Sequence, residues 1–424
     1  MKSKYDVIVV GTGAAGLFCA LNFPDDVDIC IITKKTARES DSYLAQGGIC
    51  MLRGEEDYEP YFEDTMKAGH YENNEKTVDL MIRSSNSVIR DLIRLGVCFD
   101  RDERGHLSFT KEGAHSQPRI LFHEDITGQE ITSTLLRRVR EKSNIKIFEY
   151  TTMVDIIEKN NVCGGLVVAD RVGEVLCIKA DNVVLACGGI GGIYKNSTNY
   201  AHITGDAIAI AIKHGIRVQN LNYIQIHPTT LYSRKKGRRF LISESVRGEG
   251  AVLLNKNEER FTDELQPRDV VSQAIWKQME IDGTEYVFED MRPIGKEMIL
   301  HHFPNIYQRC LEEGYDVLKE PIPVVPAQHY HMGGVAADLA GRTSMVGLYA
   351  VGEAGCNGVH GKNRLASNSL LESLVFAQRA ADDIIYGEKN PGCDVKVDLE
   401  KYRDLDKIFA EYRRIVLEEA ERRG

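Results

Sequence analysis

A glycine-rich turn near the N-terminus constrains the fold of this chain more than any other segment. An apolar, β-branched run at 7–10 leads into the sequence GTGAAG at 11–16, and the apolar stretch LFCAL follows at 17–21. Glycines in this spacing allow a tight turn and let the amide groups at a helix N-terminus approach a pyrophosphate. Because a second strand is expected at 27–32, the segment predicts a βαβ unit that binds a dinucleotide.

The composition narrows the class of protein. The 424 residues carry 53 Lys and Arg against 63 Asp and Glu, a net charge of −10, which disfavours coating nucleic acid or anionic lipid. There is no apolar run of about 18 residues and no signal-peptide pattern. The ten cysteines form no CxxC motif and include Cys19, Cys30, Cys98 and Cys187. We therefore expect reduced, buried thiols in a cytoplasmic protein without nucleic-acid or membrane partners.

Periodicity predicts alternating helices and strands on both sides of a less regular middle segment. The apolar positions predict helices at 77–95, 128–140, 205–214 and 369–385, and antiparallel strands at 145–148, 153–157, 165–168 and 175–178. A separate buried strand is expected at 182–186. The texture changes between 221 and 325 and the βαβ pattern returns near 345, which indicates an insertion in a nucleotide-binding domain. A charged helix is expected at 399–423.

One departure concerns the end of the second strand. The acidic residue that holds a ribose in simple NAD sites, about 20 residues after the glycines, is missing. Thr33 and Lys34 stand there instead. Lys34 is either close to a phosphate or a solvated lysine, and the sequence leaves both readings open.

Several segments resemble the fumarate reductase/succinate dehydrogenase/L-aspartate oxidase superfamily. They occur in the superfamily's order between residue 5 and about 385, and they are SYLAQGG (42–48), LACGG (185–189), TGD (204–206), HPT (227–229), ESVRGEG (244–250), PRDVV (267–271), HYHMGG (329–334), VGE (351–353) and NRLASNSLLE (363–372). The resemblance implies an α/β fold with a Rossmann-like FAD-binding domain, an inserted α+β capping domain and a short helical C-terminal tail. The implied boundaries are 1–220 and 326–388 for the FAD-binding domain, 221–325 for the capping domain and 389–424 for a truncated tail.

Two features favour the L-aspartate oxidase family within this superfamily. Respiratory subunits usually carry a histidine for covalent flavin where this chain has Asp41, so the resemblance implies noncovalent FAD. The segment TKEGAHS at 110–116 resembles the oxidase segment whose glutamate, here Glu112, faces the substrate ammonium.

The resemblance also implies the roles of individual residues. Arg268 would move a proton between substrate and solvent, Glu244 would order Arg268, and Glu112 would orient the amine. The carboxylates of the substrate would be bound by His227, Ser243, His329 and Arg364. The implied FAD contacts are Gly11, Thr12, Gly13, Ala14, Ala15, Gly16, Lys34, Asp41, Ser42, Tyr43, Leu44, Ala45, Gln46, Gly47, Gly48, Asp206, Glu353, Ser369 and Leu370.

The implied reaction is the FAD-dependent oxidation of L-aspartate to iminoaspartate, with O₂ or fumarate as electron acceptor. This is the first step of quinolinate and NAD biosynthesis, so a functional link to quinolinate synthase is expected. The alternatives are a soluble fumarate reductase or succinate dehydrogenase flavoprotein subunit, and a flavin-binding protein that has lost catalysis.

Other polar features receive structural interpretations. His301, His302 and His331 lie outside the matched functions and are interpreted as surface or packing residues, and we expect no metal site. The basic residues of the 234–239 segment are interpreted as a solvated loop that attracts anionic substrate.

Overall fold

The centre of the molecule is a seven-stranded sheet, seen in a computed structural model that describes residues 2–235, 237–393 and 395–422. Four of its strand pairs are parallel, between β5, β2, β1, β8 and β15. Strands β8, β7 and β6 continue it in antiparallel fashion. In order across the sheet, the strands are β5 (Ile145–Glu149), β2 (Ile29–Thr33), β1 (Lys4–Val10), β8 (Val175–Leu185), β7 (Val162–Ala169) and β6 (Thr152–Lys159), with β15 (Leu348–Ala350) also paired to β8.

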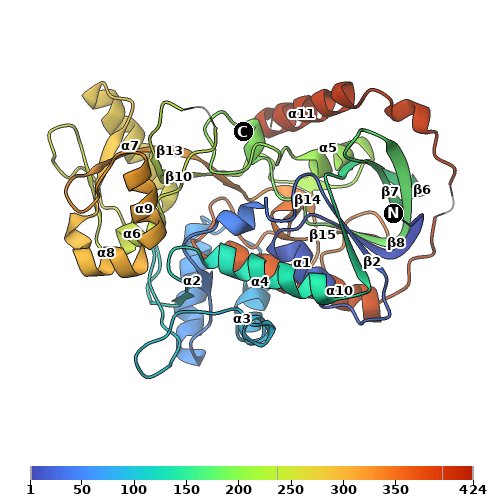
Figure 1. Cartoon of the computed structure of the whole chain (residues 1–424), viewed down its shortest axis with the longest axis horizontal. Helices are drawn as coiled ribbons and strands as arrows, with labels where there is room; N and C mark the ends of the chain where they lie inside the picture. Colours follow the sequence, from blue (N-terminus) through green and yellow to red (C-terminus); the bar gives the residue numbers. More distant parts are fainter. Residues whose placement is uncertain (1, 236, 394, 423–424) are drawn as a thin grey trace.

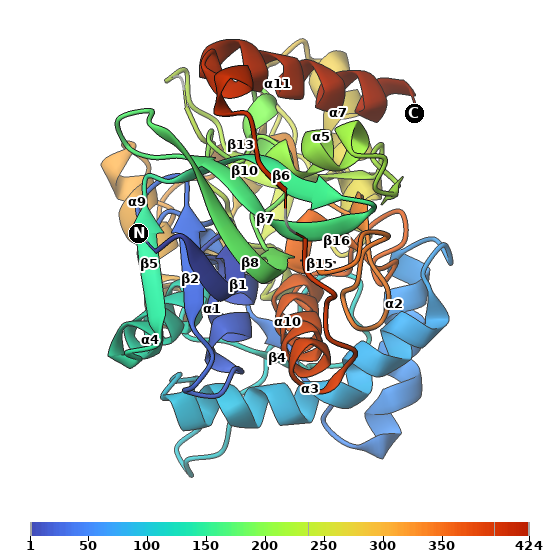
Figure 2. The same cartoon turned by 90° about the vertical axis from the view of Figure 1, so that its right-hand side faces the viewer.

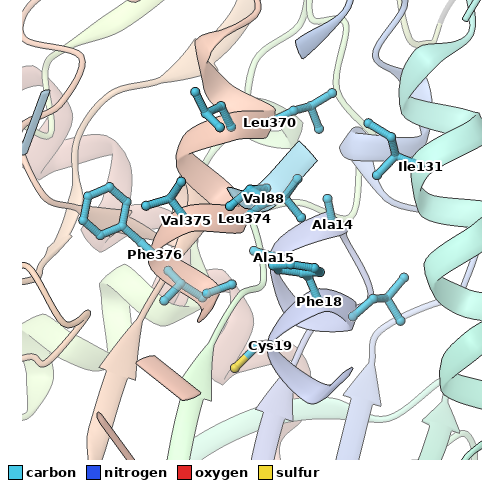
Figure 3. Packing of buried hydrophobic residues seen from close by; sticks show 14 of the residues in the cluster. Ala14, Ala15, Phe18, Cys19, Val88, Ile131, Leu370, Leu374, Val375 and Phe376 are labelled. Carbon is cyan, nitrogen blue, oxygen red and sulfur yellow. The ribbon is translucent and has the colours of Figure 1, made fainter. Parts of the chain in front are cut away.

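One face of this sheet is covered by helices that bury small and branched side chains. Helix α1 packs along α10 and α4, and α3 packs against α10 (Figures 2 and 3). Phe18 of α1 and Leu374 and Phe376 of α10 are at most 1% exposed within this cluster. The helices are α1 (Ala14–Leu21), α2 (Tyr58–Ala68), α3 (Glu75–Leu95), α4 (Thr127–Glu141) and α10 (Asn368–Tyr386). Their packing fixes the strand ends that form the site.

A second unit has a hydrophobic cluster of its own, at the left of Figure 1. Its antiparallel sheet has the order β10-β13-β12-β11. The elements are β10 (Ile224–Leu231), β11 (Val252–Leu254), β12 (Val287–Asp290), β13 (Ile322–His331), α6 (Glu244–Gly248), α7 (Arg268–Asp282), α8 (Lys296–His302) and α9 (Pro304–Glu312). We call this unit the cap; its predicted boundaries at 221 and 325 stay a prediction, and β13 runs through residue 325 without a break.

The last helix, α11 (Leu405–Arg422), lies across the other face of the molecule (Figure 1). It packs on α5 (Asp206–Lys213), with Tyr412 and Val416 at most 2% exposed. The hydroxyl of Tyr412 donates to the carbonyl of Val154, and Val416 packs against Gly205. The charged helix predicted near the end of the chain therefore has a buried apolar face. Of the predicted tail, residues 394, 423 and 424 lie outside the described residues.

Small sheets complete the region between the two units. Strand β3 (Ile49–Cys50) pairs with β4 (Ile120–Leu121), and β14 (Gly334–Ala336) pairs with β9 (Val218–Gln219) and β16 (Gly355–Cys356). Among the described residues, no helix combines the length and the apolar character that crossing a bilayer requires.

Three local predictions were wrong. The strand near 145 is not antiparallel: β5 runs parallel to β2, because it follows α4 in a crossover connection. The strands predicted at 175–178 and 182–186 form the single strand β8, whose two halves pair with different neighbours. Cys98 is exposed rather than buried, because it follows the end of α3 in a surface turn.

Stability should depend on pH through an ion pair that joins β6 to the end of α5. His214 Nε2 lies 2.7 Å from Asp155 Oδ1, and this contact raises the pKa of His214 above 6.5. Because the pKa of His214 is higher in the folded than in the unfolded protein, the ion pair contributes fully to the free energy of unfolding below pH 6.5. This contribution is lost as the pH rises through the pKa of the folded state.

We therefore expect the free energy of unfolding of the wild type, measured in urea, to fall by about 1 kcal/mol more than that of His214→Gln as the pH rises from about 6 to about 9. Equal pH dependence of the two proteins would contradict this assignment.

Candidate active site

The carboxyl ends of the parallel strands open into one large cavity. Gly11 follows β1, Lys34 follows β2, Cys187 lies just beyond β8, and Gly352 lies just beyond β15. Ligands of doubly wound sheets bind at such strand ends. The far wall of the cavity comes from the cap, through residues of β10, α6, α7 and β13.

The glycine-rich turn is shaped for close approach of a phosphate. Gly11 has φ +114°, and a Cβ there would lie 2.2 Å from the carbonyl oxygen of Ala186. Gly13 precedes α1 without a capping side chain and lines the cavity, so the helix N-terminus faces the cavity. Asp41 Oδ2 and Gln46 Oε1 also line it as buried oxygens without a hydrogen-bond partner among the described residues. These features fit a dinucleotide with polar groups on both its phosphate and ring parts.

Two carboxylates that line the cavity, those of Asp41 and Glu353, are half-buried. Burial raises the pKa of Asp41 to about 7 and that of Glu353 to about 8. Asp41 accepts a hydrogen bond from the backbone N–H of Tyr200, and Glu353 from that of His331. Backbone donors therefore hold both side chains in fixed orientations.

Lys34 is neither free nor solvated. Its Nζ lies 2.5 Å from Asp206 Oδ2 and donates to the hydroxyl of Thr204 and the carbonyl of His202, each at 3.0 Å. The same Nζ lies 5.8 Å from the centre of the Phe409 ring of α11. The reading of Lys34 as a solvated lysine is thus wrong, and its contacts tie strand β2 to the start of α5 at the edge of the cavity.

Two buried arginines face the cavity from different units. Arg268 is the first residue of α7, and its Nε lies 2.5 Å from Glu244 Oε2. Arg364 comes from the loop before α10 and stacks on Tyr330, with 4.2 Å from its Cζ to the ring centre. Burial, and next the charge of Arg268, lowers the pKa of Arg364 to about 10. Both side chains are at most 7% exposed.

A neutral amide separates these two cations. Gln225 Oε1 accepts from Arg268 Nη1 at 2.8 Å and from Arg364 Nε at 3.2 Å. Gln225 Nε2 donates to the side chain of Asn363 and to the carbonyl of Arg364. Gln225 thereby fixes the distance between two guanidinium groups that repel each other.

Two histidines line the same part of the cavity as neutral rings. His227 and His329 lie 5.2 Å apart between ring centres. Burial, together with the charge of Arg268, holds the pKa of each well below 6.5. His329 Nδ1 is 2.7 Å from Thr198 Oγ1, and His227 Nε2 is 2.9 Å from the carbonyl of Ile242, which accepts a hydrogen bond. The Ile242 carbonyl can only accept, so the one proton of the neutral His227 ring is on Nε2 and its Nδ1 is an acceptor, whereas His329 remains able to donate without adding charge.

Two acidic residues balance the arginines. Burial would raise the pKa of Glu244, but Arg268 and Arg247 hold it below its usual value, so Glu244 is ionised. Burial, and next the charge of Glu244, raises the pKa of Glu112. Glu112 Oε1 accepts from Ser245 at 2.8 Å and Oε2 from Ser367 at 2.5 Å. The cavity therefore offers a carboxylate beside two guanidinium groups.

The structure brings most of the predicted site residues into this single cavity. Ala14, Gly16 and Tyr43 do not line it: Ala14 and Gly16 are buried in α1, and Tyr43 is half-buried in the short helix Asp41–Leu44. Those that line it are Gly11, Thr12, Gly13, Ala15, Lys34, Asp41, Ser42, Leu44, Ala45, Gln46, Gly47, Gly48, Glu112, Asp206, His227, Ser243, Glu244, Arg268, His329, Glu353, Arg364, Ser369 and Leu370.

Four polar or charged residues stand out among those of the site that sequence reasoning missed. Gln225, Ser245 and Ser367 hold the charged groups, and Arg238 from the 234–239 segment lines the cavity. Ser245 and Ser367 lie inside the matched segments 244–250 and 363–372, and Gln225 stands two residues before the HPT motif, so closeness to a motif was the available signal. Lys235 pairs with Glu313, so the segment is only partly a solvated loop, and Lys236 lies outside the described residues. No group of His, Cys, Asp and Glu within the described ranges is arranged to hold a metal ion.

The first comparison defines the class of protein. The FAD binding domain family matches residues 6–370, which is most of the chain. The protein is therefore a flavoprotein whose cofactor is FAD, in agreement with the shape of the glycine turn.

Curated relatives define the family more narrowly. An L-aspartate oxidase of Clostridium perfringens is 50% identical over 420 residues, which cover 99% of this chain and 95% of that protein. An L-aspartate oxidase of Clostridium acetobutylicum is 46% identical over 385 residues, covering 91% and 88%. The chain belongs to the L-aspartate oxidase family.

Solved structures confirm the fold class. A mutant of the E. coli quinol fumarate reductase aligns with a TM-score of 0.86 and 29% identity, over 96% of this chain and 73% of that chain. A quinol-fumarate reductase with menaquinol molecules gives a TM-score of 0.87 and 30% identity, over 96% and 75%. The α/β architecture is thus shared with fumarate reductases.

Cofactor binding should depend on Gly11. The substitution Gly11→Ala adds a Cβ that overlaps the Ala186 carbonyl, so we expect FAD affinity to fall at least about tenfold, measured by quenching of flavin fluorescence. Gly283→Ala is the matched control, since Gly283 also has positive φ but nothing lies within 4 Å of an added Cβ. Unchanged FAD affinity in Gly11→Ala would contradict the assignment.

Proposed function

We propose that this protein oxidises L-aspartate to iminoaspartate with FAD, and that O₂ or fumarate then accepts the electrons. The observation that carries this proposal is the position of Glu112, whose carboxylate lines the same cavity as Arg268 and Arg364. A substrate with two carboxylates and one ammonium matches two cations and one additional anion. The names of the related L-aspartate oxidases support the same reaction.

The substrate carboxylates would be bound by Arg364, His227 and His329, with Ser243 at the same wall. A guanidinium presents two parallel N–H donors to a carboxylate, and the neutral ring of His329 adds a donor without further charge, whereas His227 would do so only in the tautomer with its proton on Nδ1. Gln225 would keep the two arginines at a fixed separation, because its Oε1 accepts from both. Glu112 would accept hydrogen bonds from the ammonium group and so fix the orientation of the Cα–H bond.

Proton transfer would be the task of Arg268. When bound, FAD supplies the hydride acceptor for the carbon–hydrogen bond that breaks. Arg268 would take up the proton released from the substrate as it gives one of its own N–H protons to ionised Glu244, so that the guanidinium keeps a single positive charge throughout. Because an isolated guanidinium is a poor base, the adjacent carboxylate is required for this step. Arg268 and Glu244 therefore act as one unit.

We further propose that FAD is bound noncovalently. Asp41 stands where the respiratory relatives carry their flavin-linked histidine, and a carboxylate cannot form that histidyl bond. The glycine turn at 11–16, the 41–48 loop, Asp206, Glu353, Ser369 and Leu370 would hold the cofactor. The division into an FAD-binding domain at 1–220 and 326–388 and a capping domain at 221–325 belongs to the same proposal, as does the tail at 389–424.

The reaction places constraints on the surroundings of the enzyme. Iminoaspartate is an imine that water hydrolyses, so an enzyme that consumes it must act promptly. We propose a functional link to quinolinate synthase, and a cytoplasmic location for the first step of quinolinate and NAD biosynthesis.

A second function has one observation in its favour. The arginine and histidine clamp makes no distinction between aspartate and unsubstituted dicarboxylates, and fumarate reductases share the fold. A soluble fumarate reductase or a succinate dehydrogenase flavoprotein subunit would use the same clamp, but neither needs a carboxylate at Glu112.

Anaerobic reduction of the holoenzyme separates these functions. We expect L-aspartate to bleach the flavin absorbance near about 450 nm, because the amine-bearing substrate alone satisfies Glu112. Fumarate added afterwards should restore the colour. Bleaching by succinate but not by L-aspartate would overturn the proposal.

The role of Glu112 can be tested by one isosteric change. Glu112→Gln should raise the KM for L-aspartate about 10- to 100-fold, since it removes a charge-assisted hydrogen bond to the ammonium. The inhibition constant of succinate should change little. Glu289→Gln is the control: Glu289 is buried outside the cavity, and burial raises its pKa to about 8, so an amide resembles its protonated form. An unchanged KM in Glu112→Gln would refute the ammonium contact.

A further inference from the structure

A buried charged cluster lies directly behind Glu112. Arg119 is fully buried, and its guanidinium contacts Asp57 Oδ1 at 2.8 Å and Asp64 Oδ2 at 2.7 Å. Both aspartates are on or next to α2. Arg119 Nη1 also donates a hydrogen bond to His115 Nδ1, 3.0 Å away. None of these four residues lines the cavity, so the proposed chemistry does not use them.

The partners of His115 determine its tautomer. A guanidinium has only N–H donors, so Nδ1 of His115 accepts from Arg119. The proton of the ring is therefore on Nε2, which donates to the carbonyl of Ala366 at 3.0 Å. Burial, and next the charge of Arg119, lowers the pKa of His115 to about 4, so the ring is neutral near pH 7. His115 thus has one fixed donor, and that donor holds one peptide group.

This peptide group belongs to a strained turn. Ser367 has φ +61°, a left-handed conformation that residues other than glycine rarely adopt. Ala114, next to His115, has φ +63°. Such conformations persist only where surrounding contacts hold them. Two hydrogen bonds join the turns, one from His115 to the Ala366 carbonyl and one from the Ser367 hydroxyl to Glu112.

The two turns carry the groups that are proposed to bind the substrate. Glu112 stands at the start of the first turn, and its carbonyl accepts from the backbone N–H of His115. Arg364 stands three residues before Ser367 on the second turn. A shift of the Ala366–Ser367 peptide group would therefore move the hydroxyl that orients the Glu112 carboxylate.

We propose that His115 is a positioning residue that fixes the Glu112 carboxylate by holding the Ala366–Ser367 turn, and that it thereby determines the preference for an amino dicarboxylate. This inference rests on the proposed function. His115 touches neither the cavity nor the substrate, so it acts only through Ser367 and Glu112. The preference for L-aspartate over succinate then depends on a residue that contacts neither molecule.

The test compares two substitutions in the FAD-loaded enzyme. His115→Leu removes both ring hydrogen bonds, and we expect the KM for L-aspartate to rise about tenfold while the inhibition constant of succinate changes less than about threefold. His115→Gln retains an amide that can accept from Arg119 and donate to Ala366, so both constants should stay within about threefold of the wild type.

A matched control separates positioning from loss of packing. His331 is also buried, lies 3.1 Å from a single carbonyl, that of Leu221, and has its pKa lowered to about 4 by burial. His331→Leu should therefore move the two constants by a common factor. If His115→Leu does not fold, Ser367→Ala removes the same link to Glu112 with little change in volume. It should also raise the KM for L-aspartate more than the inhibition constant of succinate.

The inference is overturned if His115→Leu or Ser367→Ala shifts both constants equally, or if His115→Gln behaves like His115→Leu. A wild-type enzyme whose flavin L-aspartate does not reduce would instead overturn the proposed function. The two failures are distinguishable, because the second appears without any substitution.

Discussion

The repulsion between two buried guanidinium groups is the constraint on which the rest of the site depends. Arg268 and Arg364 are both buried, and each would be unfavourable there without compensation. Gln225 separates them, and Glu244 neutralises one of them. Arg364 has only neutral hydrogen-bond partners among the described residues, so it is the cation left for an anionic ligand.

The same constraint explains why the site lies between two units. Arg268 and Glu244 belong to the cap, whereas Arg364 and Glu112 belong to the parts of the chain around the parallel sheet. Ser245 of the cap donates to Glu112, and Gln225 of the cap donates to Asn363 and to the carbonyl of Arg364. Each unit thus contributes one cation and one anion, and neither unit contains a working site alone.

The sequence indicated the residues that carry the chemistry better than the residues that hold them in place. The glycine spacing at 11–16 has a direct steric meaning, and Arg268, Arg364 and Glu112 lie in motifs that resemble a known family. Other residues carry no local signal: the pairing of Lys34 with Asp206 depends on how β2 and α5 meet, and the strain at Ser367 depends on contacts from distant segments. The direction of β5 was wrong for the same reason, since periodicity reports which face a strand buries and not which neighbour it joins.

The pairing of β15 with β8 has a consequence for how the chain reaches this structure. The C-terminal half of β8 pairs with β1 on one side and with β15 on the other, yet the whole cap lies between β8 and β15 in the chain. During synthesis, the apolar edge of β8 at 183–185 therefore lacks its second neighbouring strand until the cap has been made. Such long-range parallel pairing is slow, because the entropy of a long loop must be lost before the stabilising contacts form. Glu353, Ser369 and Leu370, which line the cavity, follow β15 in the chain, so the cavity is complete only after this pairing.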